Sequence, residues 1–190
     1  MNTLIILAHP TFEESLANKT ILNNLDTNNY NEIRNIASLY PNYEIDVKAE
    51  QEALLNADTI ILQFPFYWYS VPAILKKWLD DVFTYQFAYG SEGDKLKGKN
   101  FILSFTVGGP RDAYQEGGYN SFEIKDLIKP LEQTAHLSQM SYIEPIYTHS
   151  MIYIPNVYNT QESVVNGALE HVKKLTKVLN ELTAKLEKVV

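Results

Sequence analysis

The sequence predicts a doubly wound α/β fold, in which helices cover both faces of a parallel sheet. Short apolar runs rich in β-branched and aromatic residues occur at residues 4–8 (LIILA), 59–62 (TIIL) and 101–107 (FILSFTV). Each run is too short for a helix and is typical of a strand that is buried on both faces. Amphipathic helical patterns separate the runs, and strands alternating with helices form parallel sheets with right-handed crossovers.

The clearest helical pattern follows the strand at residues 59–62. Apolar side chains recur there at the spacing of one helix face: Val71, Ile74, Leu75, Trp78, Leu79, Val82 and Phe83. Ser70 is the expected N-cap, with Pro72 in the first turn. The remaining helices are expected at residues 16–25, 46–56, 121–134 and 161–189.

Two weaker strands complete the sheet. Residues 32–37 are polar enough for an edge strand, and a last strand is expected between residues 138 and 147. Five strands with a weak second strand favour the order 2-1-3-4-5, which is the flavodoxin-like arrangement. The length of 190 residues predicts a single domain over residues 1–190.

Composition narrows the function. The net charge is −7 and no basic run occurs, which argues against nucleic-acid binding. The absence of cysteine excludes disulfides, thiol redox chemistry and cysteine-ligated metal, and weakly favours the cytoplasm. The apolar start, MNTLIILAHP, lacks the basic region of a signal peptide, and no apolar run approaches the roughly 20 residues of a membrane span, so direct membrane insertion is not expected.

The turn after the first strand, HPTFEES, leads into a helix, which is a place where phosphates bind to helix N-terminal N–H groups. Neither G-x-G-x-x-G nor G-x-x-x-x-G-K-[ST] occurs in the chain. A loop that offers His9, Thr11, Ser15 and Asn18 suits a single phosphate. The alternative, that Ser15 only caps the helix, is equally compatible with the spacing.

Two further loops follow strands that should be central. One carries four aromatic residues, Phe66, Tyr67, Trp68 and Tyr69, between two prolines, which suits a flat conjugated ring; core or interface packing is the alternative. The other is Gly108-Gly109-Pro110, where glycines let backbone N–H groups approach a ligand, although such triplets are also plain turns.

In the order 2-1-3-4-5 these three loops converge on one crevice. A phosphate seat, an aromatic shelf and exposed amides together describe a site for a phosphorylated planar heterocycle. Flavin mononucleotide (FMN) fits this set better than a nucleoside triphosphate, which calls for a lysine and a metal ligand. FAD is the alternative, and FMN is favoured because no second phosphate cradle is visible.

Three segments carry a family resemblance. AHPTFEESLAN, QFPFYWYSVPAILKKWLDDVF and TVGGPRDAYQEGGYN resemble, in this order, the motifs of the flavodoxin-like NAD(P)H:quinone oxidoreductases. The likeness is close over residues 4–120, and the stretch from Pro65 to Pro72 is its most specific part. The short chain most resembles compact bacterial members, some of which are ancillary subunits of potassium-efflux systems.

The resemblance implies roles for individual residues. The positions that hold the flavin phosphate and ribityl chain are matched by His9, Ser15, Leu16, Ala17 and Asn18. The segment along the isoalloxazine ring is matched by Phe66, Tyr67, Trp68 and Tyr69, with Trp68 packed against the ring. The loop whose amides face the pyrimidine end of the flavin is matched by Thr106, Val107, Gly108 and Gly109. Amide donors there would stabilise negative charge near N1. Tyr114 matches a catalytic tyrosine beside the nicotinamide and quinone pocket. Asn120 stands where vertebrate members carry a histidine.

The implied function is ping-pong transfer of hydride from NAD(P)H through bound FMN to a quinone, in a cytoplasmic homodimer. Residues 113–119 and 85–89 are the expected interface segments. Two alternatives are a one-electron carrier of the flavodoxin type and a flavin-binding regulatory subunit of a membrane transporter, and azo or nitro compounds could replace the quinone. His136, His149 and His171 lack metal-ligand spacing, and no metal site is expected.

Overall fold

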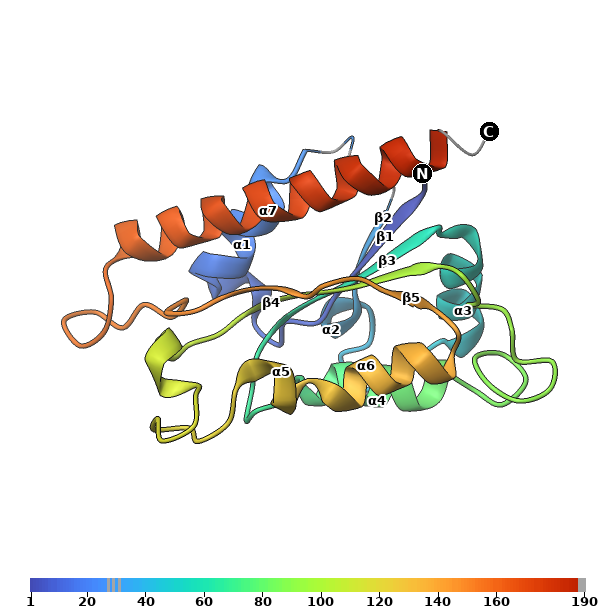
Figure 1. Ribbon diagram of the computed structural model, residues 1–190, viewed down its shortest axis with the longest axis horizontal. Helices are drawn as coiled ribbons and strands as arrows, with labels where there is room; N and C mark the ends of the chain where they lie inside the picture. Colours follow the sequence, from blue (N-terminus) through green and yellow to red (C-terminus); the bar gives the residue numbers. More distant parts are fainter. Residues whose placement is uncertain (27, 29, 31, 188–190) are drawn as a thin grey trace.

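A computed structural model describes residues 1–190 except 27, 29, 31 and 188–190. Its centre is a parallel sheet in the order β2-β1-β3-β4-β5, which confirms the predicted topology (Figure 1). The long strands are β1 (Thr3–Leu7), β3 (Thr59–Pro65) and β4 (Asn100–Thr106), and their described residues are nearly all buried. The weak strand is β2 (Glu32–Asn35), which pairs with β1 and lies at one end of the strand order.

The last strand differs from the single strand expected between residues 138 and 147. It is divided into β5 (Ser141–Tyr142) and β6 (Ile146–Thr148), and both pair in parallel with β4. Pro145 lies in the gap and has no N–H to donate to the ladder, which accounts for the interruption.

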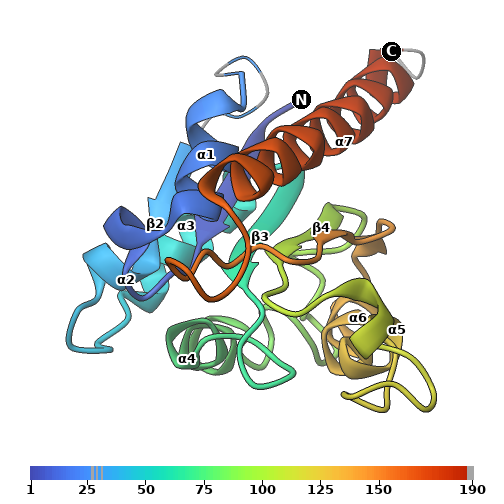
Figure 2. The ribbon, with the colours of Figure 1, turned by 90° about the vertical axis from the view of Figure 1, so that its left-hand side faces the viewer.

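Helices cover both faces of the sheet. Figure 2 looks onto the edge at which the central strands end, with α1 and α7 on one side of the sheet and α4, α5 and α6 on the other. The helices are α1 (Leu16–Asn24), α2 (Ile36–Leu39), α3 (Val47–Asn56), α4 (Ala73–Val82), α5 (Ile124–Leu127), α6 (Lys129–Leu137) and α7 (Gln161–Glu187). The predicted end of the last helix, at residues 188–189, lies outside the described residues.

Three local expectations are wrong. Ser70 is not the N-cap of α4, because its N–H and C=O are both bonded to Tyr67 in a tight turn and Pro72 occupies the cap position. The strand predicted to reach residue 37 ends at Asn35, whose side chain accepts a bond from the Ser38 N–H and starts α2 instead.

The helix expected over residues 121–134 is the third of these. Ser121 has a left-handed φ of 64°, the first helix (α5) begins at Ile124, and it stops at Ile128 before α6 begins. Pro130 lies in the first turn of α6, where a missing N–H is tolerated, whereas it could not continue the ladder of α5.

Strand alternation divides the core into two layers. Ile6, Leu62 and Leu103 face α3, α4 and α6, whereas Ile5, Ile61 and Ile102 face α1 and α7. Three buried polar side chains, those of Gln63, Ser104 and His171, interrupt the second layer.

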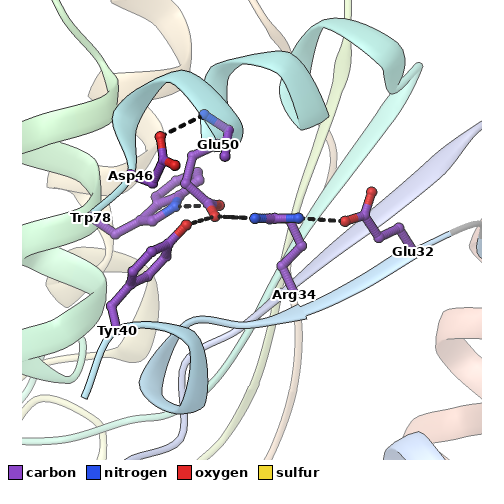
Figure 3. A network of polar contacts seen from close by, with 7 residues as sticks. Glu32, Arg34, Tyr40, Asp46, Glu50 and Trp78 are labelled. Atoms are coloured by element: carbon purple, nitrogen blue, oxygen red, sulfur yellow. Dashed lines mark hydrogen bonds and ion pairs between the residues drawn. The ribbon is translucent and has the colours of Figure 1, made fainter. Parts of the chain in front are cut away.

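A buried carboxylate joins β2, α2, α3 and α4 (Figure 3). Glu50 is fully buried, and its Oε1 accepts hydrogen bonds from Arg34 Nε at 2.8 Å and from Tyr40 Oη at 2.5 Å. Trp78 Nε1 donates to its Oε2 at 2.8 Å. The carboxylate raises the pKa of the Arg34 guanidinium, chiefly through its hydrogen bond. A buried charge is tolerated only with such partners, so this network fixes α4 and the loop before it.

Candidate functional site

A cavity of about 430 Å³ lies at the edge where β1, β3 and β4 end. The predicted loops converge here, and α1 begins at its wall. Eight of the predicted site residues line it: His9, Ser15, Leu16, Asn18, Phe66, Tyr67, Thr106 and Gly108.

The other predicted residues do not line this cavity. Ala17 and Val107 are packed in the two core layers. Trp68 is 92% exposed, and Tyr69 is also exposed. Gly109 and Tyr114 lie next to each other beyond the cavity wall: a Cβ at Gly109 would come within 3.1 Å of the Tyr114 ring.

The α1 end of the cavity is rich in hydrogen-bond donors. Ser15 Oγ accepts from the Asn18 N–H at 3.1 Å, so Ser15 caps the helix as one of the two readings expected. Its hydroxyl also lines the cavity, so capping and ligand binding are compatible. The N–H groups of Leu16 and Ala17 belong to the first turn, which has no intrahelical carbonyl to accept from them. This end suits an anion.

His9 adds a further donor. Its Nδ1 accepts a hydrogen bond from the Thr11 N–H at 3.1 Å, so the neutral ring carries its proton on Nε2. Burial lowers the pKa of His9, which keeps the ring neutral near pH 7. A neutral His9 is therefore a hydrogen-bond donor to the cavity rather than a permanent charge.

The aromatic loop is a tight turn. The Tyr67 N–H donates to the Ser70 carbonyl at 3.1 Å and the Ser70 N–H returns a bond at 3.0 Å. Trp68 and Tyr69 stand at the corner with φ of 47° and 62°, the left-handed conformation of both central residues of a type I′ turn. Such backbone is costly for non-glycine residues and is often found at binding sites. The turn directs Tyr67 to the cavity and leaves Trp68 exposed.

The glycine loop keeps some amides available. The Val107 N–H donates to the Thr148 carbonyl at 2.8 Å and is therefore engaged. Within the described part of the chain, no acceptor is bonded to the N–H groups of Gly108 and Gly109. The N–H groups of Gly108 and Gly109 are therefore the amides of this loop that can donate to a ligand.

Tyr114 lies between two rings. Its centroid is 6.4 Å from that of Phe66 and 5.3 Å from that of His149, whose Nδ1 is 3.3 Å from the Gly109 carbonyl. Burial raises the pKa of Tyr114, with smaller contributions from two neighbouring tyrosines, so its hydroxyl stays protonated near neutral pH. The side chain of Asn120 is bonded to Tyr69 rather than to Tyr114: its Oδ1 accepts a hydrogen bond from Tyr69 Oη at 3.0 Å.

The sequence interpretation missed the segment of Met151, Ile152 and Tyr153, which forms another wall of the cavity. A signal was present, because this loop follows the last strand and must leave the sheet at the same edge as the others. Gly167 of α7 gives it room: a Cβ there would come within 2.9 Å of Met151 Sδ. No group of three or more potential ligands for a metal occurs among the residues the structure describes.

Comparison with known proteins identifies the family to which this fold belongs. Residues 1–175 match the family described as having the flavodoxin-like fold, and the chain belongs to that family. The uncharacterized NAD(P)H oxidoreductase YdeQ of Bacillus subtilis (strain 168) is 39% identical over 182 residues, which cover 94% of this chain and 88% of YdeQ. The potassium-efflux ancillary protein KefF of Enterobacter sp. (strain 638) is 42% identical over 146 residues, 77% of this chain and 82% of KefF.

Two solved structures are similar over nearly the whole chain. General stress protein 14 of Treponema denticola, in complex with FMN, has a TM-score of 0.84 and 31% identity over 96% of this chain and 99% of its own. An NADPH-quinone reductase from P. pentosaceus has a TM-score of 0.72 and 30% identity over 92% and 98%. The predicted resemblance to flavodoxin-like NAD(P)H:quinone oxidoreductases is confirmed, and the oxidoreductase class with it.

Proposed function

We propose that this protein is an FMN-dependent NAD(P)H:quinone oxidoreductase. The observation that carries the proposal is the mixed lining of the 430 Å³ cavity: hydrogen-bond donors gather at its α1 end, and the aromatic side chains of Phe66 and Tyr67 also line it. A phosphate monoester joined to a flat ring matches both features. The complex of the Treponema relative with FMN supports this choice.

The donor end fits the phosphate. Ser15, His9 Nε2 and the first-turn amides of α1 can each donate to a phosphate oxygen, and the helix dipole adds favourable potential. Neither the dinucleotide motif G-x-G-x-x-G nor the triphosphate motif G-x-x-x-x-G-K-[ST] occurs, so the sequence offers no second phosphate cradle and FMN is a better fit than FAD.

The aromatic end fits the ring system. Phe66 and Tyr67 supply flat faces, and the Gly108 amide can stabilise negative charge on the pyrimidine side. When bound, FMN supplies the redox chemistry, taking hydride from NAD(P)H and passing two electrons to a quinone in alternating half-reactions. Tyr114, protonated and next to the glycine loop, would then donate a hydrogen bond to the substrate.

An anaerobic visible spectrum tests this function directly. The protein is mixed with FMN, then with NADPH, then with a quinone such as menadione. We expect bound flavin to bleach within seconds and to regain its colour with the quinone. Bound flavin that stays yellow would leave the one-electron carrier or a sensor as the function, and a protein that binds no FMN would contradict the proposal.

The protein would act as a single domain of residues 1–190, in a cytoplasmic homodimer. A groove of about 370 Å³ between α4 and α6 is lined by Val71, Leu79, Leu131 and Leu137, and it shares Phe66 with the FMN cavity. Exposed apolar surface of this kind marks interaction sites, and we assign this groove to the second copy of the proposed homodimer. No helix among the described residues is long and apolar enough to cross a membrane.

The dimer has its own test. Leu137 is 60% exposed, so Leu137→Arg should shift the protein from dimer to monomer in light scattering without unfolding it. Leu55→Arg, at an exposed site on α3 away from the groove, is the matched control. A wild-type protein that is monomeric at working concentration would contradict the dimer.

A second function is favoured by the similarity to KefF, which is named as an ancillary protein of a potassium-efflux system. A flavin-binding subunit could bind such a transporter and still reduce quinones. Affinity purification from the native membrane fraction decides between them: co-purification of an efflux transporter supports the ancillary role, and its absence leaves a free enzyme.

A further inference from the structure

A line of polar side chains crosses the apolar layer between the sheet and the helices α1 and α7. His171 of α7, Ser104 of β4 and Gln63 of β3 are completely buried there, among residues such as Ile61 and Leu175. Hydrogen bonds connect these three residues to Thr148 at one end and to Asn18, Thr106 and Ser15 at the other. We call these seven residues the buried polar chain. Its far end lies at the α1 end of the FMN cavity.

The central bonds define a direction. Gln63 Nε2 donates to Asn18 Oδ1 at 2.8 Å, which leaves Gln63 Oε1 to accept from the Ser104 hydroxyl at 2.6 Å. A serine hydroxyl has one hydrogen, and the Ser104 hydroxyl donates it in the hydrogen bond to Gln63 Oε1. Ser104 Oγ can therefore only accept from its other partner, His171 Nε2, at 2.8 Å.

This fixes the tautomer of His171. Its Nε2 must carry the hydrogen, and a neutral imidazole has only one, so Nδ1 accepts from the Thr148 hydroxyl at 3.0 Å. Burial lowers the pKa of His171 to about 3, in keeping with a neutral ring. The chain thus begins at Thr148 and donates toward the cavity.

The same direction reaches the ligand end. Asn18, which is 1% exposed, uses the two hydrogens of Nδ2 for Thr106 Oγ1 at 3.1 Å and Ser15 Oγ at 3.2 Å. Ser15 Oγ also accepts the Asn18 N–H. Both hydroxyls thus accept from the protein, and their hydrogens remain for a ligand in the cavity that they line.

We propose that the buried polar chain makes Ser15 an obligate hydrogen-bond donor and leaves the hydroxyl hydrogen of Thr106 for the ligand. His171, in its Nε2–H tautomer, is then a positioning residue that favours a phosphate-bearing ligand through this chain of hydrogen bonds. The inference deepens the proposed FMN site. If the chain ran the other way, Asn18 Oδ1 would take both hydroxyl hydrogens, and the oxygens of a phosphate would meet lone pairs.

Solution NMR reads the direction without reference to activity. In the uniformly ¹⁵N-labelled full chain with FMN bound, a long-range ¹H–¹⁵N spectrum distinguishes the two histidine tautomers. The His171 signals are assigned by their loss in His171→Gln. We expect the Nε2–H tautomer at pH 7; the Nδ1–H tautomer, or a charged ring, overturns the inference.

Ligand affinity tests the consequence. FMN and riboflavin, which lacks the phosphate, are titrated by fluorescence quenching, and the ratio of their affinities is the readout. His171→Leu and Ser104→Ala break the chain, so Gln63 and Asn18 can reverse, and the preference for FMN should fall about tenfold, as expected for a weakened hydrogen bond to a charged group. His171→Gln, whose amide N–H can still donate to Ser104, should restore most of it.

The outcomes of these experiments distinguish a failure of this inference from a failure of the proposed function. His136→Gln, on an exposed part of α6, is the control and should leave the ratio unchanged. If His171→Leu fails to fold, Ser104→Ala carries the test, since it removes one hydroxyl. An unchanged ratio in a folded chain-breaking variant overturns the inference while FMN binding stands. A wild-type protein that binds no FMN overturns the proposed function.

Discussion

The indole Nε1 of Trp78 donates a hydrogen bond to Glu50 Oε2 over 2.8 Å, and neither residue is accessible to solvent. The bond joins the middle of α4 to the first turn of α3. Because α4 follows the aromatic turn at residues 67–70, the position of the turn depends on a carboxylate that does not line the cavity. The apolar face of α4 alone would allow sliding that this directional bond resists.

Removing the carboxylate should be strongly destabilising. Glu50→Ala leaves the Tyr40 hydroxyl and the Trp78 N–H without their acceptor and leaves Arg34 paired with Glu32 alone, and we expect a loss of about 3–5 kcal/mol in the free energy of unfolding. Urea denaturation measures it. Glu52→Ala, at an exposed site on the same helix, should change stability by less than about 0.5 kcal/mol. Equal effects of the two substitutions would contradict the role of the network.

The stability should depend on pH through His171. Its pKa is about 3 when folded and about 6.5 when unfolded, so between these values the unfolded chain binds a proton that the folded chain does not. The free energy of unfolding therefore falls as the pH drops below about 6.5, by up to about 1.4 kcal/mol per pH unit. His171→Gln lacks this contribution. Urea unfolding at pH 7 and 5.5 should show a smaller loss for the variant, and identical losses would contradict a neutral buried His171.

Replacing Ser15 should weaken binding of the flavin phosphate without affecting binding of the ring system. Ser15→Ala removes a hydroxyl that both caps α1 and faces the cavity, and we expect FMN affinity to fall about tenfold while riboflavin affinity changes little. Thr20→Ala, which removes a hydroxyl bonded to the Leu16 carbonyl within the same helix, is the control. A parallel loss for both ligands would indicate general damage to α1 rather than a lost phosphate contact.

The aromatic shelf should depend more on Tyr67 than on Trp68. The stacking inferred for Trp68 remains a prediction, but Tyr67 is the residue that lines the cavity. We expect Tyr67→Ala to weaken FMN binding by about 1–2 kcal/mol, and Trp68→Ala to have a smaller effect. Trp68→Gly separates backbone from ring, because glycine accepts the left-handed φ of 47°. A larger loss for Trp68→Ala would restore the indole as the stacking partner.

The sequence was sufficient for the sheet order because three strands are apolar on both faces, a pattern that is typical of the central strands of a parallel sheet. It also located three loops of the cavity, since the carboxyl ends of adjacent parallel strands must meet. Helix starts were less certain. Ser70 has the chemistry of an N-cap, but the turn with Tyr67 uses both of its backbone groups.

Side-chain direction within the site could not be predicted from the sequence. Phe66, Tyr67 and Trp68 are consecutive aromatic residues, and only the two left-handed residues of the turn decide which ones face the cavity. Gln63 and Ser104 were visible as polar residues in apolar strands. Their partner His171 lies far away in sequence, and its pairing depends on how α7 packs on the sheet.

Gly167 has a consequence for how variable this protein can be. Replacing a glycine inside a helix by alanine ordinarily stabilises the helix by about 1 kcal/mol. Here a Cβ would meet Met151 Sδ at 2.9 Å, so the Met151 side chain, which lines the cavity, would have to shift. The missing side chain in α7 thus leaves room for one residue of the cavity wall, and a substitution that improves the helix would disturb the binding site.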